Sequence, residues 1–225
     1  MADKKIEKAL YGPSAVEVAL GAFLGFLCGL LVACVYLMFK PVKTVSEPEK
    51  EPVAGVVYYQ PGTSDAGRAR QWIAKHKRFL AGGSVEVNED ELNSWASAEL
   101  GGSKAPAAGA PDEGGTRFFT AQKPNFRIHD GVLQVGFMCR VDYFGATKDL
   151  QVIARGRIVR DGSGFAFQPD EFYLGSCPLH KLSLIGSPLI ATLSRLHPVS
   201  EETKEAWRKL SDVQIDGRVL RLTVP

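Results

Sequence analysis

The feature that most constrains this chain is an uninterrupted apolar run near its beginning. Residues 18–39 contain no charged side chain and are apolar on every side of a helix. At 1.5 Å per residue such a helix would be about 33 Å long, close to the roughly 30 Å hydrocarbon core of a bilayer. A core helix of a globular domain is usually shorter and amphipathic. The run therefore predicts a transmembrane helix over 18–39, preceded by a short tail over 1–17.

Two processing signals compete with this interpretation. A secretory signal peptide has an apolar region of only about 7 to 15 residues, shorter than this run. Leu31-Val32-Ala33-Cys34 resembles a bacterial lipobox, in which the cysteine is lipidated after cleavage. The apolar residues continue past Cys34 to Phe39, however, and cleavage would leave them exposed beside the anchor. We predict an uncleaved single-pass protein and keep lipidation as the alternative.

Small residues recur at every fourth position of the run, at Gly21, Gly25, Gly29 and Ala33. Steps of four residues drift by only about 40° around a helix, so these positions form one shallow groove. In lipid, where helices gain nothing from hydrophobic association, missing side chains let two backbones approach closely. The spacing predicts a helix-packing surface for a second copy or for another transmembrane helix. The alternative is that glycine is simply frequent in membrane helices.

Charge does not decide the orientation of the helix. Three lysines precede the run and three follow it closely, so the positive-inside rule is balanced. The tail over 1–17 is too short to form a domain, and we therefore place the large C-terminal portion outside the cytoplasm as the working part. The net charge of +2 favours neither nucleic acid nor an acidic partner.

Residues 40–63 are rich in proline and mixed charge, which predicts an extended stalk. A helix is predicted over 64–81, with Ser64 as its cap. The residues expected on its inward face are Ala69, Trp72, Ile73, His76 and Leu80. Its other face is basic, and it either contacts anionic lipid head groups or is an ordinary solvated surface.

A short strand over 84–87 leads into a second helix over 89–100. Asn88, followed by a glutamate three residues later, has the form of a capping box at its start. Residues 101–115 are of low complexity and are predicted to be a disordered insert.

The C-terminal half alternates between apolar and polar residues over long stretches, chiefly 133–143 and 150–158. This period of two predicts strands with one apolar face, and Asp-Gly pairs at 130–131, 161–162 and 216–217 predict hairpin turns. An apolar run over 182–196 has helical spacing, although Pro188 interrupts it, and a last helix begins at Ser200.

Long strands with one apolar face must bend over whatever they cover. We therefore predict an α+β fold over 64–225, in which a long curved antiparallel sheet wraps on the apolar helix. One N-terminal transmembrane helix precedes this extracytoplasmic domain.

Catalytic and cofactor motifs are missing from the sequence: it has no G-x-S-x-G, no H-E-x-x-H and no glycine-rich phosphate loop. Cys177 and His180 are two metal-ligand types, but a zinc site needs about four ligands. Cys139 and Cys177 are either one disulfide or two small buried hydrophobes. We predict no enzyme activity, no catalytic residue, no metal and no cofactor.

Three short motifs resemble the YpmS-like bacterial membrane-anchored proteins and, more distantly, the tubular lipid-binding superfamily. They are the helix start Glu89–Asn93, the turn Tyr173–Leu179 and the final hairpin Val213–Leu222. With the order of elements, the resemblance covers about residues 84–224. It implies a single-pass protein of the bacterial cytoplasmic membrane, with no catalytic residues to carry over. The chain departs from the pattern in the 101–115 insert and in the basic helix over 65–81.

Two functions remain after these exclusions. The first is binding or handling of membrane lipid or another apolar ligand in a groove. The second is a structural or assembly role in a membrane complex, with a filled core and no ligand. The residues predicted to line a groove are Phe126, Leu133, Val135, Phe137, Val141, Val152, Phe165, Phe167, Leu189 and Leu193. Spare volume between the sheet and the apolar helix distinguishes the two.

Overall fold

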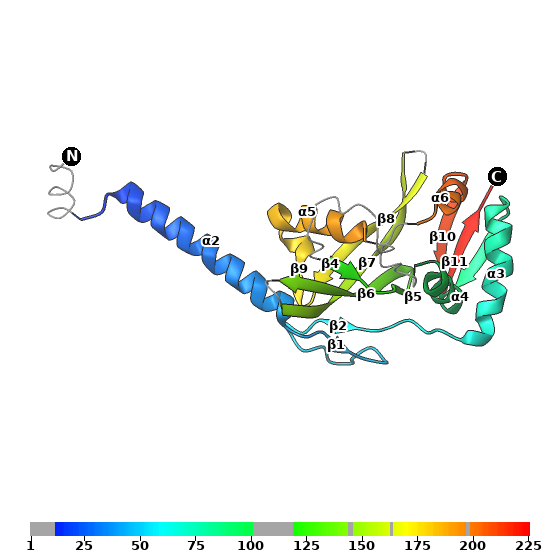
Figure 1. The fold of residues 1–225 in the computed structure, drawn as a ribbon, viewed down its shortest axis with the longest axis horizontal. Helices are drawn as coiled ribbons and strands as arrows, with labels where there is room; N and C mark the ends of the chain where they lie inside the picture. The colour runs from blue at the N-terminus through cyan, green and yellow to red at the C-terminus, as the bar shows by residue number, and fades with distance from the viewer. Residues whose placement is uncertain (1–11, 101–118, 144–145, 163, 197–198) are drawn as a thin grey trace.

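The computed structural model describes residues 12–100, 119–143, 146–162, 164–196 and 199–225. One long helix, α2 (Ala15–Phe39), projects from one end of a domain built of sheets and helices (Figure 1). The strands of the two larger sheets pair antiparallel throughout. The predicted α+β class, with an N-terminal apolar helix followed by a large sheet, is therefore confirmed. The predicted insert over 101–115 and most of the tail lie outside the described residues.

α2 begins at Ala15, earlier than predicted, because Ser14 caps it. The Ser14 hydroxyl accepts a hydrogen bond from the Glu17 backbone N–H, and the Glu17 carboxylate accepts one from the Ser14 N–H. This capping box satisfies two N–H groups that the first turn leaves free. Within the described residues, α2 is the one helix long and apolar enough to cross a membrane. Most of its large side chains are exposed, as a lipid-facing surface requires.

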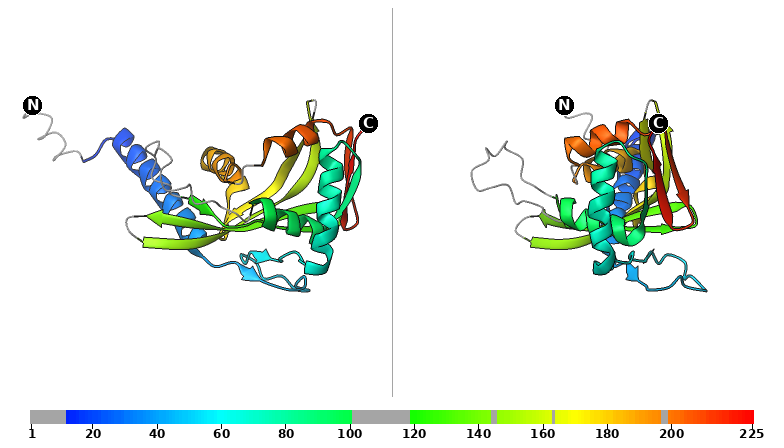
Figure 2. Two further views of the ribbon diagram at one scale, coloured as in Figure 1. Left: turned by 45° about the vertical axis from the view of Figure 1, so that its right-hand side comes forward. Right: turned by 90° about the vertical axis from the view of Figure 1, so that its right-hand side faces the viewer.

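The main sheet has the strand order β4-β6-β7-β8-β9, and β5 also pairs with β6. Its strands are β4 (Phe119–Ala121), β5 (Asn125–His129), β6 (Val132–Tyr143), β7 (Ala146–Asp161), β8 (Gly164–Leu174) and β9 (Cys177–Pro178). Gly131 and Gly162 form the expected hairpin turns, with φ values of 75° and 57° that favour glycine. The register shifts between Arg155 and Gly156, and Figure 2 shows the long strands curving.

The two faces of the main sheet are covered by different segments of the chain. Figure 2 shows α5 (Ser183–Ser194) and α6 (Glu201–Arg208) over the concave face and residues 40–63 along the convex face. Leu133 and Phe137 are buried, as the alternation predicts. Gly136 lies between them in sequence and faces the opposite way, where a Cβ atom would approach the Tyr59 ring to 2.3 Å. Only glycine therefore leaves room for that ring on the sheet.

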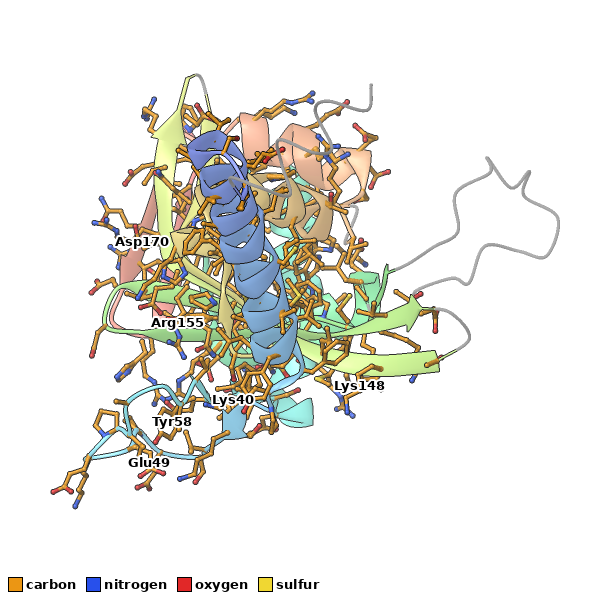
Figure 3. All side chains as sticks on the ribbon, turned by 90° about the vertical axis from the view of Figure 1, so that its left-hand side faces the viewer. Lys40, Glu49, Tyr58, Lys148, Arg155 and Asp170 are labelled. Carbon is orange, nitrogen blue, oxygen red and sulfur yellow. The ribbon has the colours of Figure 1, made fainter. Side chains whose placement is uncertain are left out.

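Residues 40–63 are extended, and their second half is docked on the sheet. β1 (Lys43–Thr44) pairs in parallel with β2 (Tyr58–Tyr59). Arg155 of β7 donates a hydrogen bond to the Tyr58 carbonyl and pairs with Glu171 at 3.1 Å. Figure 3 shows Arg155 lying over the segment that carries Tyr58. The segment is thus held against the domain, which its composition alone does not indicate.

A second sheet closes the end of the domain away from α2 (Figure 1). Its order is β10-β11-β3, formed by β3 (Val85–Asn88), β10 (Asp212–Asp216) and β11 (Val219–Thr223). Two further helices, α3 (Ala66–Leu80) and α4 (Glu89–Trp95), contribute with α6 to the hydrophobic cluster at this end. The helix predicted over 89–100 is not one α-helix, because α4 gives way to a π-helix over Ala96–Leu100.

Two details of α3 differ from the prediction. Asp65, not Ser64, is the cap residue, and its carboxylate accepts a hydrogen bond from the Gly67 N–H at 2.7 Å. Ile73 was expected to face inward, but it is 58% exposed, whereas Trp72 and Phe79 are buried. The inward stripe is therefore rotated toward the large aromatic side chains, which contact α4 and the second sheet.

The end of α2 is fixed to the turn between β8 and β9. The Ser176 backbone N–H donates to the Leu37 carbonyl at 2.9 Å, and the Ser176 hydroxyl lies 3.1 Å from the Lys40 carbonyl. These contacts satisfy carbonyl groups that the last turn of a helix leaves free. Gly175 has a φ of 57°, and a Cβ atom there would lie 1.9 Å from the Met38 carbonyl oxygen. α2 is therefore joined directly to the core of the domain.

Candidate functional site

An apolar cavity of about 680 Å³ lies between the main sheet and the helices. Its apolar lining residues are Trp72, Phe79, Val87, Leu92, Trp95, Leu100, Pro124, Phe126, Leu133, Val135, Phe137, Ala154, Ile158, Phe167, Pro169, Phe172, Ile190, Leu193, Val199, Trp207, Leu220 and Leu222. Protein interiors hold few voids larger than a water molecule, whereas small-molecule sites span roughly 300–1,000 Å³. The cavity is therefore of the size of a ligand site rather than of a packing defect.

The cavity lies between two hydrophobic clusters. One, at the α5 end, includes Phe137, Phe172 and Leu193 and extends to Cys34 of α2. The other, at the α3 end, includes Trp72 and residues of α4, α6 and the second sheet. Both clusters contribute lining residues. Figure 2 shows α5 over one end of the concave face and α6 over the other.

Six of the ten predicted groove residues line the cavity: Phe126, Leu133, Val135, Phe137, Phe167 and Leu193. The other four, Val141, Val152, Phe165 and Leu189, do not. Val152 is fully buried, Val141 and Leu189 pack against the cluster at the α5 end, and Phe165 packs against the cluster at the α3 end. The structure thus brings six of the predicted residues together, five from the main sheet and Leu193 from α5, and places the other four outside the cavity.

All three tryptophans of the chain, Trp72, Trp95 and Trp207, line the cavity, and none was predicted to. Trp72 lies against the rings of both His76 and Trp95, with ring centroids 5.0 and 6.0 Å apart. Trp207 donates its indole N–H to the Phe165 carbonyl at 2.6 Å. The signal in the sequence was their position on short amphipathic helices, but nothing local placed those helices over the sheet.

Among the polar residues of the cavity wall, the charged ones are cationic, namely Lys204 and Arg208. The polar lining residues are His76, Ser194, Thr203, Lys204 and Arg208, and no carboxylate of a described residue lines the cavity. Lys204 pairs with Glu201 at 2.7 Å, and the Glu201 carboxylate is itself mostly exposed. Hydrogen bonding and attraction from Lys204 lower the pKa of Glu201. These cations come from α6, which contacts α3 at this end of the domain.

A cluster of buried acidic and amide side chains on α4 serves the fold. The Glu89 carboxylate accepts hydrogen bonds from the backbone N–H groups of Thr63 (2.6 Å) and Ile128 (3.0 Å). Asn93 bonds both the N–H and the carbonyl of Phe126. These side chains take the place of a neighbouring strand at the outer edge of β5. The motif over Glu89–Asn93 therefore has a structural explanation.

Glu91 is also held inside this network. Its carboxylate, which is fully buried, pairs with Lys75 at 2.7 Å and accepts the Asn88 backbone N–H at 3.0 Å. Such pairing is what a buried charge requires. Lys75 is thereby withdrawn from the basic face of α3. That face lies at the end of the domain away from α2 (Figure 1).

Of the side chains considered for chemistry, the two thiols are packed in the core and His180 is half-buried. Cys139 and Cys177 are free and fully buried, and burial raises the pKa of each thiol to about 11. His180 Nδ1 accepts the Phe172 backbone N–H at 3.1 Å. Among the described residues, no group of three or more His, Cys, Asp or Glu side chains is placed to hold a metal ion.

The predicted packing face of α2 is open in the structure. No described atom outside the local helix lies within 4 Å of the place where a Cβ atom would sit on Gly21, Gly25 or Gly29, and Ala33 is exposed. Cys34, the next residue, is buried against the domain. One side of α2 is thus used by the domain near its end, while the small residues remain available.

Comparison with known proteins gives no relative: no family model, no curated protein and no solved structure matches the chain.

Proposed function

We propose that this chain is a single-pass membrane protein whose C-terminal domain binds membrane lipid or another apolar ligand. The observation that carries the proposal is the apolar cavity of about 680 Å³ on the concave face of the main sheet. An empty apolar space of this size forgoes the packing contacts of the atoms around it. An acyl chain supplies those contacts and needs no polar partner along its length.

The connection between the cavity and the membrane helix supports the same proposal. α2 is hydrogen-bonded to the β8–β9 turn through Ser176, and Cys34, Leu37 and Met38 pack with the cluster that forms one end of the cavity. A lipid-binding site fixed to a membrane helix stays close to its source of ligand. We place the domain outside the cytoplasm, at the bacterial cytoplasmic membrane.

We propose binding rather than catalysis because the carboxylates of the buried residues Glu89 and Glu91 are engaged in structural contacts. Glu89 is occupied by two backbone N–H groups and Glu91 by Lys75 and the α4 cap. An assembly role for α2 is the second candidate, favoured by the open face at Gly21, Gly25 and Gly29. The two roles are compatible, since they use different parts of the chain.

Lipid carried by the purified protein tests the proposal. The full chain, extracted in a mild detergent and exchanged into a lipid-free amphipol, should retain lipid that native mass spectrometry detects as discrete mass additions. Phe137→Trp, which enlarges a lining side chain without adding charge, should reduce that occupancy. A cavity-remote substitution, Lys77→Gln on the exposed face of α3, should leave it unchanged. A folded protein that carries no lipid under any extraction would contradict the proposal.

A further inference from the structure

The two helices over the concave face differ sharply in charge. Residues 182–194, which include all of α5, contain no charged side chain, whereas α6 has five charged residues in eight. A surface helix in water normally has a strongly polar outer face. The exposed residues of α5 are instead small and uncharged: Ser187, Pro188, Ala191, Thr192 and Ser194.

Two hydroxyl groups on the exposed side of α5 are bonded to its own backbone. The Thr192 hydroxyl donates to the Pro188 carbonyl at 2.9 Å, and the Ser194 hydroxyl donates to the Ile190 carbonyl at 2.8 Å. A bond to the carbonyl four residues earlier is how serine and threonine satisfy their protons in membrane helices. These two exposed side chains therefore do not need water as a hydrogen-bond acceptor.

The domain meets α2 before that helix ends. A bilayer core takes about 20 residues of helix, and any 20 consecutive residues chosen from the uncharged run over 18–39 include Cys34. Cys34 is buried in the cluster that also contains Leu193 of α5, and Leu189 and Ile190 pack against the same cluster. The α5 end of the domain therefore lies level with the last turns of the membrane run, not beyond them.

The charged residues nearest to α5 lie at its two ends. Lys181 and Arg195, both exposed, flank the uncharged segment. Long cationic side chains in such positions reach the head groups while the helix between them contacts apolar material. Of the two helices over the concave face, α5 is also the nearer to α2 in Figure 1 and in Figure 2.

We propose that α5 lies in the interface of the bilayer that α2 spans, with its exposed face against lipid. The lipid-facing surface of α2 then continues onto α5, which is the kind of contact that an interfacial helix makes. Ile190 and Leu193 line the cavity from the other side of α5, so this one helix separates the cavity from the bilayer. The inference rests on the membrane-spanning role of α2 in the proposed function and does not depend on a bound ligand.

Spin labels report whether α5 is in lipid or in water. Cys28 is the exposed cysteine of the chain, and Cys34, Cys139 and Cys177 are buried, so the parent protein is labelled at Cys28 on α2 and gives the reference for the bilayer. Cys28→Ser with Ala191→Cys places the label on the exposed face of α5. Cys28→Ser with Glu205→Cys, on the exposed face of α6, is the matched control.

Each full-length protein is labelled in detergent and reconstituted into nanodiscs of phosphatidylcholine and phosphatidylglycerol. Power saturation then measures the access of oxygen, which concentrates in lipid, and of a polar nickel chelate. We expect chelate access at Ala191→Cys to be about tenfold or more below that at Glu205→Cys, because polar solutes partition poorly out of water. Oxygen access at Ala191→Cys should approach that at Cys28. Thr192→Cys replaces Ala191→Cys if the latter lowers Tm.

The outcomes separate this inference from the proposed function. Equal chelate access at Ala191→Cys and Glu205→Cys, with Cys28 shielded, overturns the interfacial position of α5 and leaves the proposed function standing. Low access of both reagents at Ala191→Cys means that a protein surface covers α5, and it also overturns the inference. Free access of the chelate to Cys28 shows that α2 does not span the bilayer, which overturns both.

Discussion

Two substitutions on strand β7 distinguish a domain with an open cavity from a domain with a filled core. Val152 and Ala154 lie two residues apart on β7, on the same face of the main sheet. Ala154 pairs with Val135 and Phe172 and lines the cavity, whereas Val152 pairs with Phe137 and Leu174 and is fully buried outside it. Phenylalanine at either position points in the same direction. Ala154→Phe adds the larger volume, yet we expect it to be tolerated better.

The expected magnitudes follow from the space that each new ring meets. At Val152 the ring has no free volume, and overpacking typically costs about 1–3 kcal/mol. For a domain of this size, that corresponds to a fall in Tm of about 2–12 °C. At Ala154 the ring enters a space of about 680 Å³. Burial of its apolar surface then offsets any local strain, so the free energy of unfolding should be unchanged or rise by up to about 2 kcal/mol.

The assay compares thermal unfolding of the delipidated full-length variants by tryptophan fluorescence. Delipidation matters because bound ligand adds its own stabilisation to the parent protein. In the presence of lipid, Ala154→Phe should also lower the bound fraction, since its ring occupies part of the cavity. If Ala154→Phe lowers Tm as much as Val152→Phe, the space is closed in solution and the argument for a ligand site is refuted.

Three further predictions concern the rest of the chain. Gly25→Leu with Gly29→Leu should abolish self-association or co-purification of a membrane partner in detergent cross-linking, and an unchanged pattern would make the glycine spacing accidental. The intact mass of the extracted protein should match an uncleaved chain, whereas an acylated species beginning at Cys34 would refute the transmembrane prediction. Burial raises the pKa of Tyr59 to about 12, so the folded state retains that proton more strongly than the unfolded state, and its contribution to stability is full below about pH 10 and lost as the pH rises toward 12. Tyr59→Phe should make this alkaline loss of stability, up to about 3 kcal/mol, shallower in thermal unfolding at pH 9–12, and an equal pH dependence in both proteins would exclude Tyr59 as its source.

The strands were predictable because their signals are local. The alternation over 133–143 and the Asp-Gly pairs are properties of neighbouring residues, and β6 with its turn reproduces them. Ser200 likewise caps α6 as expected, because a cap needs only the residues of the next turn. The same locality explains why Leu133, Val135 and Phe137, which alternate on β6, could be placed together on one face of the sheet.

The far end of the cavity was not predictable for the opposite reason. The inward face predicted for α3 contained both Trp72 and Ile73, and only contact with α4 and the second sheet buries Trp72 and Phe79 while leaving Ile73 exposed. The sequence around Gly136 does not indicate why that residue must be glycine. The reason is the ring of Tyr59, which is far away in sequence and lies where a side chain at position 136 would be. Docking of this kind depends on which segments meet, and no window of the sequence contains both.

The joint at Ser176 has a mechanical consequence. A transmembrane helix whose apolar length exceeds the thickness of the bilayer accommodates the difference by tilting. In a protein with a flexible linker that tilt would stop at the membrane surface. Here the carbonyl groups of Leu37 and Lys40 are bonded to Ser176, and Gly175 lies against Met38. In the proposed single-pass protein, α2 would therefore act as a lever, and a thinner or thicker bilayer would change the orientation of the whole domain and the height of its far end above the membrane.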